Sequence, residues 1–336
     1  MRVLMPGRIL ERHVGGNTTY ARELASHLRR LGVQVDAMPY GATPAATLAL
    51  ETLTGLRREK AVLHYTSDTG PLISTRTPSV LTVHGIASRW ISTARTPSQE
   101  RVWRARVSRA IRSVDRLVTV SESSADDIAA VFGVDRGDVT VIPHGIDHAT
   151  YATPTALSDA VRASLPPDFL LYLGNVEPRK NLVELVRAVE LDAGLPPLVI
   201  AGKPAWNHEE SMRAIAASTR TTYLGFVSDS DRVALMQACT AFVFPSLYEG
   251  FGFPVVEALA AGAPVITSDR GSLVEVSGPS RMLAGLDAAA VAAGVAEALA
   301  DDEWTQRCRA EGPLWAAHFS WEASARRHLE VYEAAR

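Results

Sequence analysis

The chain has only two cysteines in 336 residues, Cys239 and Cys308. Two cysteines cannot build a disulfide framework, and neither belongs to a cluster with the spacing of a metal site. No apolar run approaches the ~18 residues of a membrane-spanning helix, and the first residues lack an apolar stretch of signal-peptide length. We therefore expect a cytoplasmic protein without a bound metal.

Basic residues are not in excess either. The 34 Lys and Arg against 37 Asp and Glu give a net charge of -3, which argues against nucleic acid as a partner. Short-period repeats and low-complexity tracts are also missing. With 47% hydrophobic and 21% charged residues, the composition is that of a soluble globular protein, and the length suits two domains.

Short apolar runs alternate with amphipathic helical patterns along the chain. The predicted strands are Val33–Met38, Ala61–Tyr65, Ser79–Val83, Arg116–Val120, Val139–Ile142, Phe169–Leu173, Leu198–Ala201, Thr222–Leu224, Ala241–Phe244 and Pro264–Thr267. This alternation predicts two α/β domains, each a doubly wound, Rossmann-like parallel sheet. The polar, proline-containing stretch Asp147–Pro167 predicts the break between domains 1–150 and 151–320. A helix within 321–336 is expected to complete the first domain.

The most informative segment runs from Glu249 to Glu257. After an apolar strand, Gly250-Phe251-Gly252 forms a loop, and Pro254 suits the first turn of a helix that ends at Gly262. The N–H groups and dipole of such a helix favour an anion such as phosphate. Two flanking carboxylates accept hydrogen bonds from hydroxyls, which suits a nucleotide sugar. Each acid alone has a plainer explanation, as a dipole complement or a solvated loop residue.

Other candidates follow predicted strands, where open α/β sheets bind ligands. Asn175, Arg179 and Lys180 follow Phe169–Leu173. The two basic residues could neutralise a diphosphate or form an ordinary exposed pair. Phe226 and Val227 follow another strand and could present backbone groups to a nucleobase or form a plain turn.

The N-terminal half contains further candidates. Gly15 and Gly16 open the first long helix, where glycine lets the backbone approach a ligand and the helix N-terminus favours an anion. A helix entry turn explains this pair equally well. His84 stands at a strand end, where a lone histidine is more often a hydrogen-bonded structural residue than a catalytic one.

Two charged patterns have structural interpretations. Asp229-Ser230-Asp231 matches a short metal-binding pattern, but it precedes a predicted helix and has no further ligand nearby, so we interpret its Asp as an N-cap. The predicted helix Arg101–Arg112 carries arginines along one side. Such a stripe could rest on anionic lipid at the inner face of a membrane or meet a phosphorylated acceptor. We favour the solvated face of a packed helix.

With these residues in view, the chain resembles the family-4 group of retaining glycosyltransferases, which have the GT-B architecture of two Rossmann-like domains facing across a cleft. The resemblance runs nearly end to end. Its strongest matches are Leu173–Asn181 and Phe244–Glu257, and further matches lie at Gly15-Gly16, Thr82–His84 and Val141–Asp147.

This resemblance implies an acceptor-side domain at 1–150, a donor-binding domain at 151–320, and no metal or cofactor. Glu249 would contact the transferred sugar, Glu257 the ribose, and Lys180 with Arg179 the diphosphate. His84 would face the sugar and acceptor. The other substrate-binding positions would be Gly15, Gly16, Asn175, Phe226, Val227, Gly250, Phe251, Gly252 and Phe253.

The sequence departs from the family pattern at several positions. Asn175 stands where many members carry a phosphate-binding arginine, so the positive charge rests on Lys180 and Arg179. Gly85 follows the histidine where many members have Asp, and His144 replaces a frequent Asn. The N-terminal domain is also short, which leaves less surface for acceptor recognition.

The resulting hypothesis is retaining transfer of a hexose from a nucleoside-diphosphate sugar to a hydroxyl of a glycan, a lipid-linked glycan or a small metabolite. The Glu177–Asn181 variant resembles mannosyl- and rhamnosyl-transferring members, so GDP-mannose leads and UDP and dTDP sugars follow. The alternatives are a GT-B enzyme that hydrolyses or epimerises its donor, and a non-catalytic nucleotide-sugar-binding partner of another transferase. A nicotinamide dehydrogenase would need Gly-x-Gly-x-x-Gly, which Gly15-Gly16 does not provide.

Overall fold

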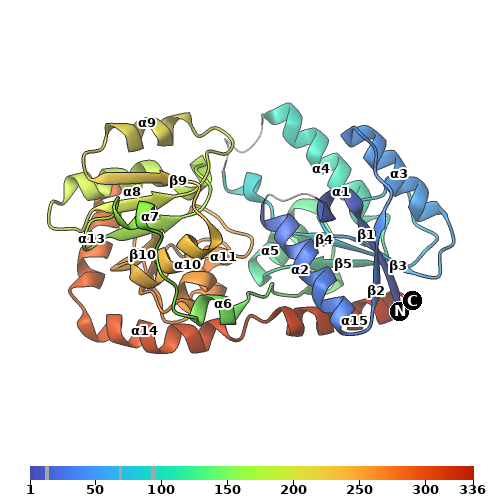
Figure 1. The fold of residues 1–336 in the computed structure, drawn as a ribbon. Helices are drawn as coiled ribbons and strands as arrows, with labels where there is room; N and C mark the ends of the chain where they lie inside the picture. Colours follow the sequence, from blue (N-terminus) through green and yellow to red (C-terminus); the bar gives the residue numbers. More distant parts are fainter. Residues whose placement is uncertain (12–14, 68–69, 92–95) are drawn as a thin grey trace. The chain divides into compact units, whose positions relative to one another are not determined.

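The computed structural model describes residues 1–11, 15–67, 70–91 and 96–336. The chain divides into two compact units, one of Met1–Gly145 with Phe319–Arg336 and one of Ile146–His318. The division falls just ahead of Asp147–Pro167. Each unit has a six-stranded sheet flanked by helices (Figure 1).

The sheet of the N-terminal unit is parallel throughout, in the order β2-β1-β3-β4-β5-β6. Its strands are β1 (Arg2–Pro6), β2 (Gln34–Met38), β3 (Val62–Tyr65), β4 (Ser79–Val83), β5 (Arg116–Thr119) and β6 (Val139–Val141). Its helices are α1 (Gly7–Leu10), α2 (Gly16–Arg30), α3 (Pro44–Leu56), α4 (Pro97–Ile111), α5 (Glu122–Phe132) and α15 (Trp321–Ala335), with 3-10 turns η1 (Ala87–Arg89) and η2 (Arg136–Asp138). The last helix, α15, packs against α2 and β4 (Figure 1).

The sheet of the C-terminal unit is also parallel, in the order β12-β11-β10-β7-β8-β9. Its strands are β7 (Leu170–Leu173), β8 (Leu198–Ala201), β9 (Thr221–Gly225), β10 (Ala241–Phe244), β11 (Val265–Thr267) and β12 (Arg281–Met282). Its helices are α6 (His148–Ala152), α7 (Asp159–Arg162), α8 (Leu182–Leu191), α9 (Glu209–Ala217), α10 (Asp229–Ala238), α11 (Phe253–Ala260), α12 (Leu273–Val276), α13 (Ala288–Leu299) and α14 (Asp302–Ala316), with a 3-10 turn η3 (Pro178–Lys180).

These sheets confirm the predicted fold class. All ten predicted strands are present as β2 to β11, each within one residue at either end, and the predicted C-terminal helix is α15. The sequence reasoning missed β1 and β12. β1 lies at the very start of the chain, and β12 has only two residues, too few for a periodic pattern.

Strand order decides where a ligand site can form. The central strands β7, β8 and β10 are buried along their whole length, as expected for a parallel sheet covered on both faces. In the C-terminal unit, the chain starts at β7, runs outward through β8 and β9, and then returns to β10 on the other side. The loops after β7 and β10 therefore flank the topological switch point, where open α/β sheets bind ligands.

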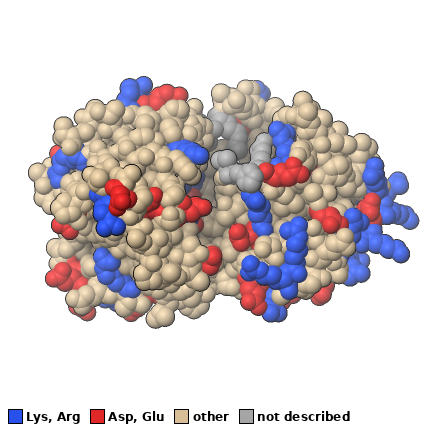
Figure 2. Space-filling view, viewed as in Figure 1, with Lys and Arg blue, Asp and Glu red and all other residues tan. Residues whose placement is uncertain are grey.

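Within the described ranges, no helix is both long and apolar enough to cross a membrane. On the face drawn in Figure 2, basic and acidic side chains are interspersed on each unit.

Candidate active site

The loops that follow β7 and β10 are bonded to each other. The backbone N–H of Leu247 donates to the carbonyl of Arg179 at 2.8 Å, and the Ser246 Oγ lies 3.1 Å from the same carbonyl oxygen. These bonds hold the two predicted segments, Leu173–Asn181 and Phe244–Glu257, side by side at the switch point.

Glu249 lies at the centre of this arrangement and is buried. Its Oε1 accepts hydrogen bonds from Lys180 Nζ at 2.6 Å and Ser246 Oγ at 2.7 Å, and its Oε2 accepts one from Arg179 Nη1 at 2.5 Å. Burial opposes ionisation, but the two cations and these hydrogen bonds outweigh it and lower the pKa of Glu249 to about 2. Glu249 is therefore a carboxylate at neutral pH.

Arg179 is held by a fork of contacts. Its Nη2 and Nε donate to Glu177 Oε1 at 2.6 and 2.9 Å, and its Nη1 also donates to the Tyr248 carbonyl at 2.8 Å. Burial would lower the pKa of Arg179, but Glu249 and Glu177 raise it, so the guanidinium stays charged. These contacts hold the Arg179 guanidinium in a fixed position.

Lys180 is buried, and its Nζ lies 4.7 Å from the centre of the Phe244 ring. Burial and the neighbouring Arg179 lower the pKa of Lys180, whereas Glu249 opposes that shift. Lys180, Arg179, Glu177 and Glu249 together form a cluster of two cations and two anions, which we call the switch-point cluster.

The loop after Glu249 leads into α11, as predicted. Gly252 has a φ of 97°, which favours glycine, and an added Cβ would lie 2.8 Å from Leu273 Cδ2, so a larger residue would also have to shift that side chain. Pro254 lies in the first turn of α11, and Gly262 follows its end with a φ of 75°. The glycine loop therefore presents the N-terminus of α11 beside the switch-point cluster.

Glu257 points to a different partner from Glu249. It is buried within α11 and forms an ion pair with Arg232, which also donates a hydrogen bond to the Tyr151 hydroxyl. Burial would lower the pKa of Arg232, but Glu257 and Tyr151 raise it. The two acids of the predicted pair thus lie in separate ion-pair networks.

The other predicted donor contacts lie at strand ends of the same unit. The Asn175 side chain is exposed, and its backbone carbonyl accepts a hydrogen bond from Tyr172 at 2.8 Å. The Phe226 ring is 69% exposed after β9 and lies 4.1 Å below Lys203 Nζ, and Val227 follows it, half-buried. Phe251 is buried and makes an edge contact with Phe253 at 5.0 Å.

The N-terminal candidates belong to the other unit. Gly15, with a φ of 94°, precedes α2, which begins at Gly16. His84 is half-buried, and its Nε2–H donates to the Thr66 carbonyl at 2.9 Å, so Nε2 carries a proton. The ring also lies 4.9 Å from Tyr20 and 5.3 Å from His144, so His84 belongs to a packed aromatic cluster.

The prediction that Asp229 or Asp231 caps a helix was wrong in detail. Ser228 is the N-cap of α10, and its hydroxyl accepts a hydrogen bond from the Asp231 N–H. Asp229 and Asp231 lie in the first turn, and the Asp231 carboxylate accepts hydrogen bonds from the backbone and hydroxyl of Ser158. Ser228 was overlooked because both Ser and Asp are favoured caps.

The arginines along α4 are not equivalent. Arg104 forms an ion pair with Glu100 at 2.5 Å, and Arg109 donates to the Leu72 carbonyl at 2.5 Å. Trp103, Val107 and Ala110 pack on the core side, as predicted. Contact of Arg101–Arg112 with a membrane stays a prediction.

Three residues of the site were not predicted to be site residues. Glu177 and Ser246 stand within the recognised segments, two and three residues from Arg179 and Glu249. This closeness in sequence is a signal from which their contacts could have been predicted. Arg232 comes from α10, a separate strand–helix unit, and no spacing links it to Glu257.

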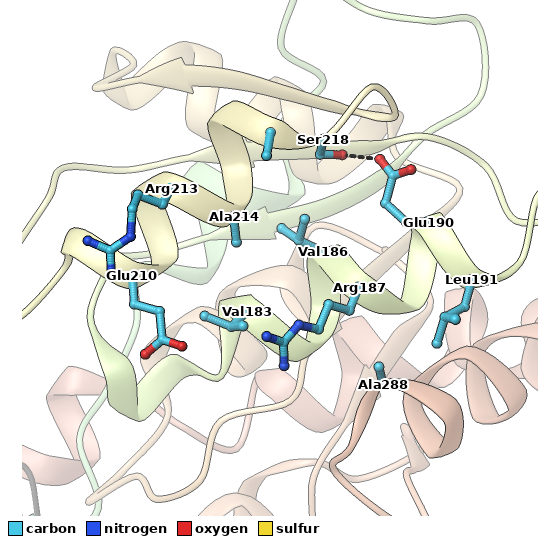
Figure 3. A pocket seen from close by; sticks show the side chains of 11 residues that line it. Val183, Val186, Arg187, Glu190, Leu191, Glu210, Arg213, Ala214, Ser218 and Ala288 are labelled. Carbon is cyan, nitrogen blue, oxygen red and sulfur yellow. Dashed lines mark hydrogen bonds between the residues drawn. The ribbon is translucent and has the colours of Figure 1, made fainter.

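A groove of about 630 Å³ lies elsewhere on the C-terminal unit, between α8 and α9 (Figure 3). Val183, Val186 and Ala214 form its apolar part, and the charged Arg187 and Glu210 border it. None of its lining residues is a predicted site residue, so it is separate from the switch-point cluster.

Comparisons with known proteins agree with this architecture. Residues 56–150 match the family described as Glycosyltransferase Family 4, and residues 156–315 match the family described as Glycosyl transferases group 1. The O-antigen chain mannosyltransferase B of Escherichia coli is 33% identical over 66% of this chain and 61% of its own length. A glycogen synthase of Mycobacterium tuberculosis is 33% identical over 77% of this chain and 64% of its own length. The chain thus matches less than two thirds of the length of these relatives.

Solved structures show the same fold at low identity. Sucrose-phosphate synthase from Thermosynechococcus elongatus aligns with a TM-score of 0.80 at 19% identity, over 99% of this chain and 98% of that one. Anabaena HepE, in complex with UDP-glucose, aligns with a TM-score of 0.77 at 17% identity, over 99% of this chain and 100% of that one. With two parallel sheets and a match to each of the two domain families in turn, the chain belongs to the family-4-like glycosyltransferases of GT-B fold.

Proposed function

We propose that the protein transfers a hexose from a nucleoside-diphosphate sugar to a hydroxyl acceptor, with retention at the anomeric carbon and without a metal. The observation that carries this proposal is the buried contact of Glu249 with both Lys180 and Arg179 beside the N-terminus of α11. Two fixed cations and a helix N-terminus favour the diphosphate of a donor, and a carboxylate beside them accepts hydrogen bonds from sugar hydroxyls.

The chemistry requires stabilisation of a leaving diphosphate. As the bond between the anomeric carbon and the phosphate oxygen breaks, negative charge grows on that oxygen, and Lys180 and Arg179 lie where they would oppose it. Losing one such preorganised contact typically costs about 3 kcal/mol of barrier. The acceptor oxygen bonds to the anomeric carbon on the same face, and its proton passes to the departing phosphate.

Mannose is the favoured sugar and GDP the favoured nucleotide. A mannosyltransferase from Escherichia coli and a D-rhamnosyltransferase from Pseudomonas aeruginosa are each 33% identical to this chain over their matched stretches, which supports this choice. The same relatives also support a glycan hydroxyl as the acceptor. Both cysteines are buried and unbridged, which suits the reducing cytoplasm, where we place the reaction.

A panel of GDP, UDP and dTDP sugars, assayed in excess chelator, tests the proposal. Thermal shift reports binding and nucleotide release reports turnover, each for wild type, Lys180→Met and the exposed-lysine control Lys60→Met. We expect one donor to stabilise and to be turned over by wild type and the control only. Binding of no donor would refute the proposal.

The same panel separates the two alternatives. Turnover that candidate acceptors leave unchanged, with free sugar or an epimerised donor as product, would identify a hydrolase or epimerase. Binding without turnover in the presence of acceptors would identify a nucleotide-sugar-binding partner of another transferase.

A further inference from the structure

The N-terminal unit contains charged side chains that lack partners. Glu51 of α3 is 3% exposed, and its Oε2 accepts no hydrogen bond. Arg106 of α4 is half-buried, and its Nε is enclosed without an acceptor. Buried polar groups are nearly always satisfied, so an enclosed carboxylate and an enclosed guanidinium nitrogen in one place require an explanation.

Three charges act on one another at this place. The fields of Arg106 and Arg8 both act on the Glu51 carboxyl, although burial dominates and raises its pKa to about 7. Neither arginine forms an ion pair with a described residue. Glu11, next to α1, is engaged by the Tyr40 hydroxyl. The place therefore has one buried acid and two guanidinium groups that form no ion pair with the described residues.

The position in the fold suits a ligand. β1 has β2 on one side and β3 on the other, so the switch point of this sheet lies between β1 and β3. Arg8 follows β1 directly within α1. The Tyr65 hydroxyl, from the last residue of β3, donates to the Glu51 carbonyl at 3.3 Å.

We propose that Arg8, Arg106 and Glu51 form an acceptor subsite for an anionic saccharide, with the two guanidinium groups on its phosphate and the Glu51 carboxyl on a hydroxyl. Guanidinium groups pair with phosphate through charge-assisted hydrogen bonds, and a carboxyl oxygen accepts from hydroxyls. This inference names the acceptor class for the transfer proposed above, and it rests on that function for its biological meaning.

Binding of a hexose 6-phosphate, the unphosphorylated hexose and inorganic phosphate, measured by calorimetry, tests the subsite. All measurements use the Lys180→Met background, so that the donor site does not contribute. We expect the hexose phosphate to bind and Arg106→Met to weaken it by about tenfold or more. Arg101→Met, exposed on the same helix, is the matched control and should change nothing.

Glu51→Gln separates a binding role from a structural one. Removing the only acidic charge of the trio while keeping its shape should tighten phosphate binding at pH 8. Equal binding of the two hexoses, or equal affinity in Arg106→Met and its control, would overturn the subsite. An alkyl phosphodiester of the same hexose shows whether a free or a lipid-linked phosphate is preferred, and binding of either supports the subsite.

Donor binding in the wild-type background keeps this inference distinct from the function itself. Arg106→Met should leave nucleoside-diphosphate affinity unchanged. If no donor binds but the hexose phosphate does, the transferase proposal fails while the subsite stands.

Discussion

Lys180 and Glu249 form a buried ion pair, with 2.6 Å between Nζ and Oε1, at the switch point of the C-terminal sheet. Arg179 closes the pair from the other side of the carboxylate. The cations that we assign to a diphosphate are therefore already neutralised, and a donor must compete with Glu249 for them. This competition gives the site a specific mutational signature.

Glu249→Gln should separate binding from transfer. Without its negative charge, Lys180 and Arg179 are released for phosphate, so affinity for the nucleoside diphosphate should rise while transfer falls. Leaving the buried Lys180 without its carboxylate partner, while Arg179 keeps Glu177, should also lower the free energy of unfolding by roughly 3 kcal/mol. Calorimetry with the nucleotide, together with denaturant unfolding, measures both. Unchanged transfer would show that Glu249 has no role in the reaction.

Lys180→Met should act in the opposite direction on nucleotide binding. The methionine keeps most of the side-chain volume against Phe244 but removes the charge, so affinity should fall by tenfold or more, since a charged hydrogen bond is worth about 2 kcal/mol. Lys60→Met removes an exposed lysine and should leave binding as it is. Equal affinities in the two variants would exclude a phosphate contact at Lys180.

Gly252→Ala and Gly262→Ala form a matched pair around α11. Both glycines have positive φ, so alanine should cost about 1 kcal/mol of stability at either position. Only at Gly252 does the new Cβ also come too close to a neighbour, Leu273 Cδ2 at 2.8 Å, so that either the buried Leu273 side chain or the loop must shift. Steady-state kinetics should therefore show a raised donor KM for Gly252→Ala alone. A normal KM in that variant would remove the glycine loop from the donor site.

The sequence allowed much of this architecture to be predicted. Apolar runs located the buried strands, and the Glu249–Glu257 segment correctly indicated a strand, a glycine loop and a helix that begins at Phe253. It did not indicate that Lys180 and Arg179 contact Glu249. These two residues precede Glu249 by 69 and 70 positions, and their loops meet only because β7 and β10 are neighbours in the sheet. The Arg232 contact with Glu257 was hidden for the same reason.

The C-terminal helix should be sensitive to acid. His328 of α15 is buried, donates from Nδ1 to the Ser324 carbonyl at 2.8 Å and accepts at Nε2 from the Tyr20 hydroxyl at 2.8 Å. Burial lowers the pKa of His328 to about 4, against 6.5 for an ordinary histidine. Between these two pH values the unfolded chain binds more protons than the folded one. The contribution of His328 to the free energy of unfolding is therefore fully present above pH 6.5 and is lost as the pH falls toward 4.

This shift corresponds to about 3 kcal/mol of unfolding free energy for the N-terminal unit. Burial also lowers the pKa of His64, whose Nδ1 forms a hydrogen bond with the Tyr332 hydroxyl at 2.7 Å. His64 therefore adds to the loss of stability at low pH. Hydrogen exchange of α15 amides at pH 7 and pH 5 measures the effect. His328→Gln should flatten the pH dependence, and His318→Asn, at an exposed position, should preserve it. An α15 equally protected at both pH values would contradict the account.

The most direct test of the central claim is the anomeric configuration of the first product formed from GDP-α-mannose in excess chelator, followed by NMR before mutarotation. If the switch-point cluster supports retaining transfer, wild type should release GDP together with an α-mannosyl product, and Lys180→Met should release neither. A β-configured first product would contradict retention. The absence of turnover with GDP-mannose and with every other nucleotide sugar would contradict the assignment of the site.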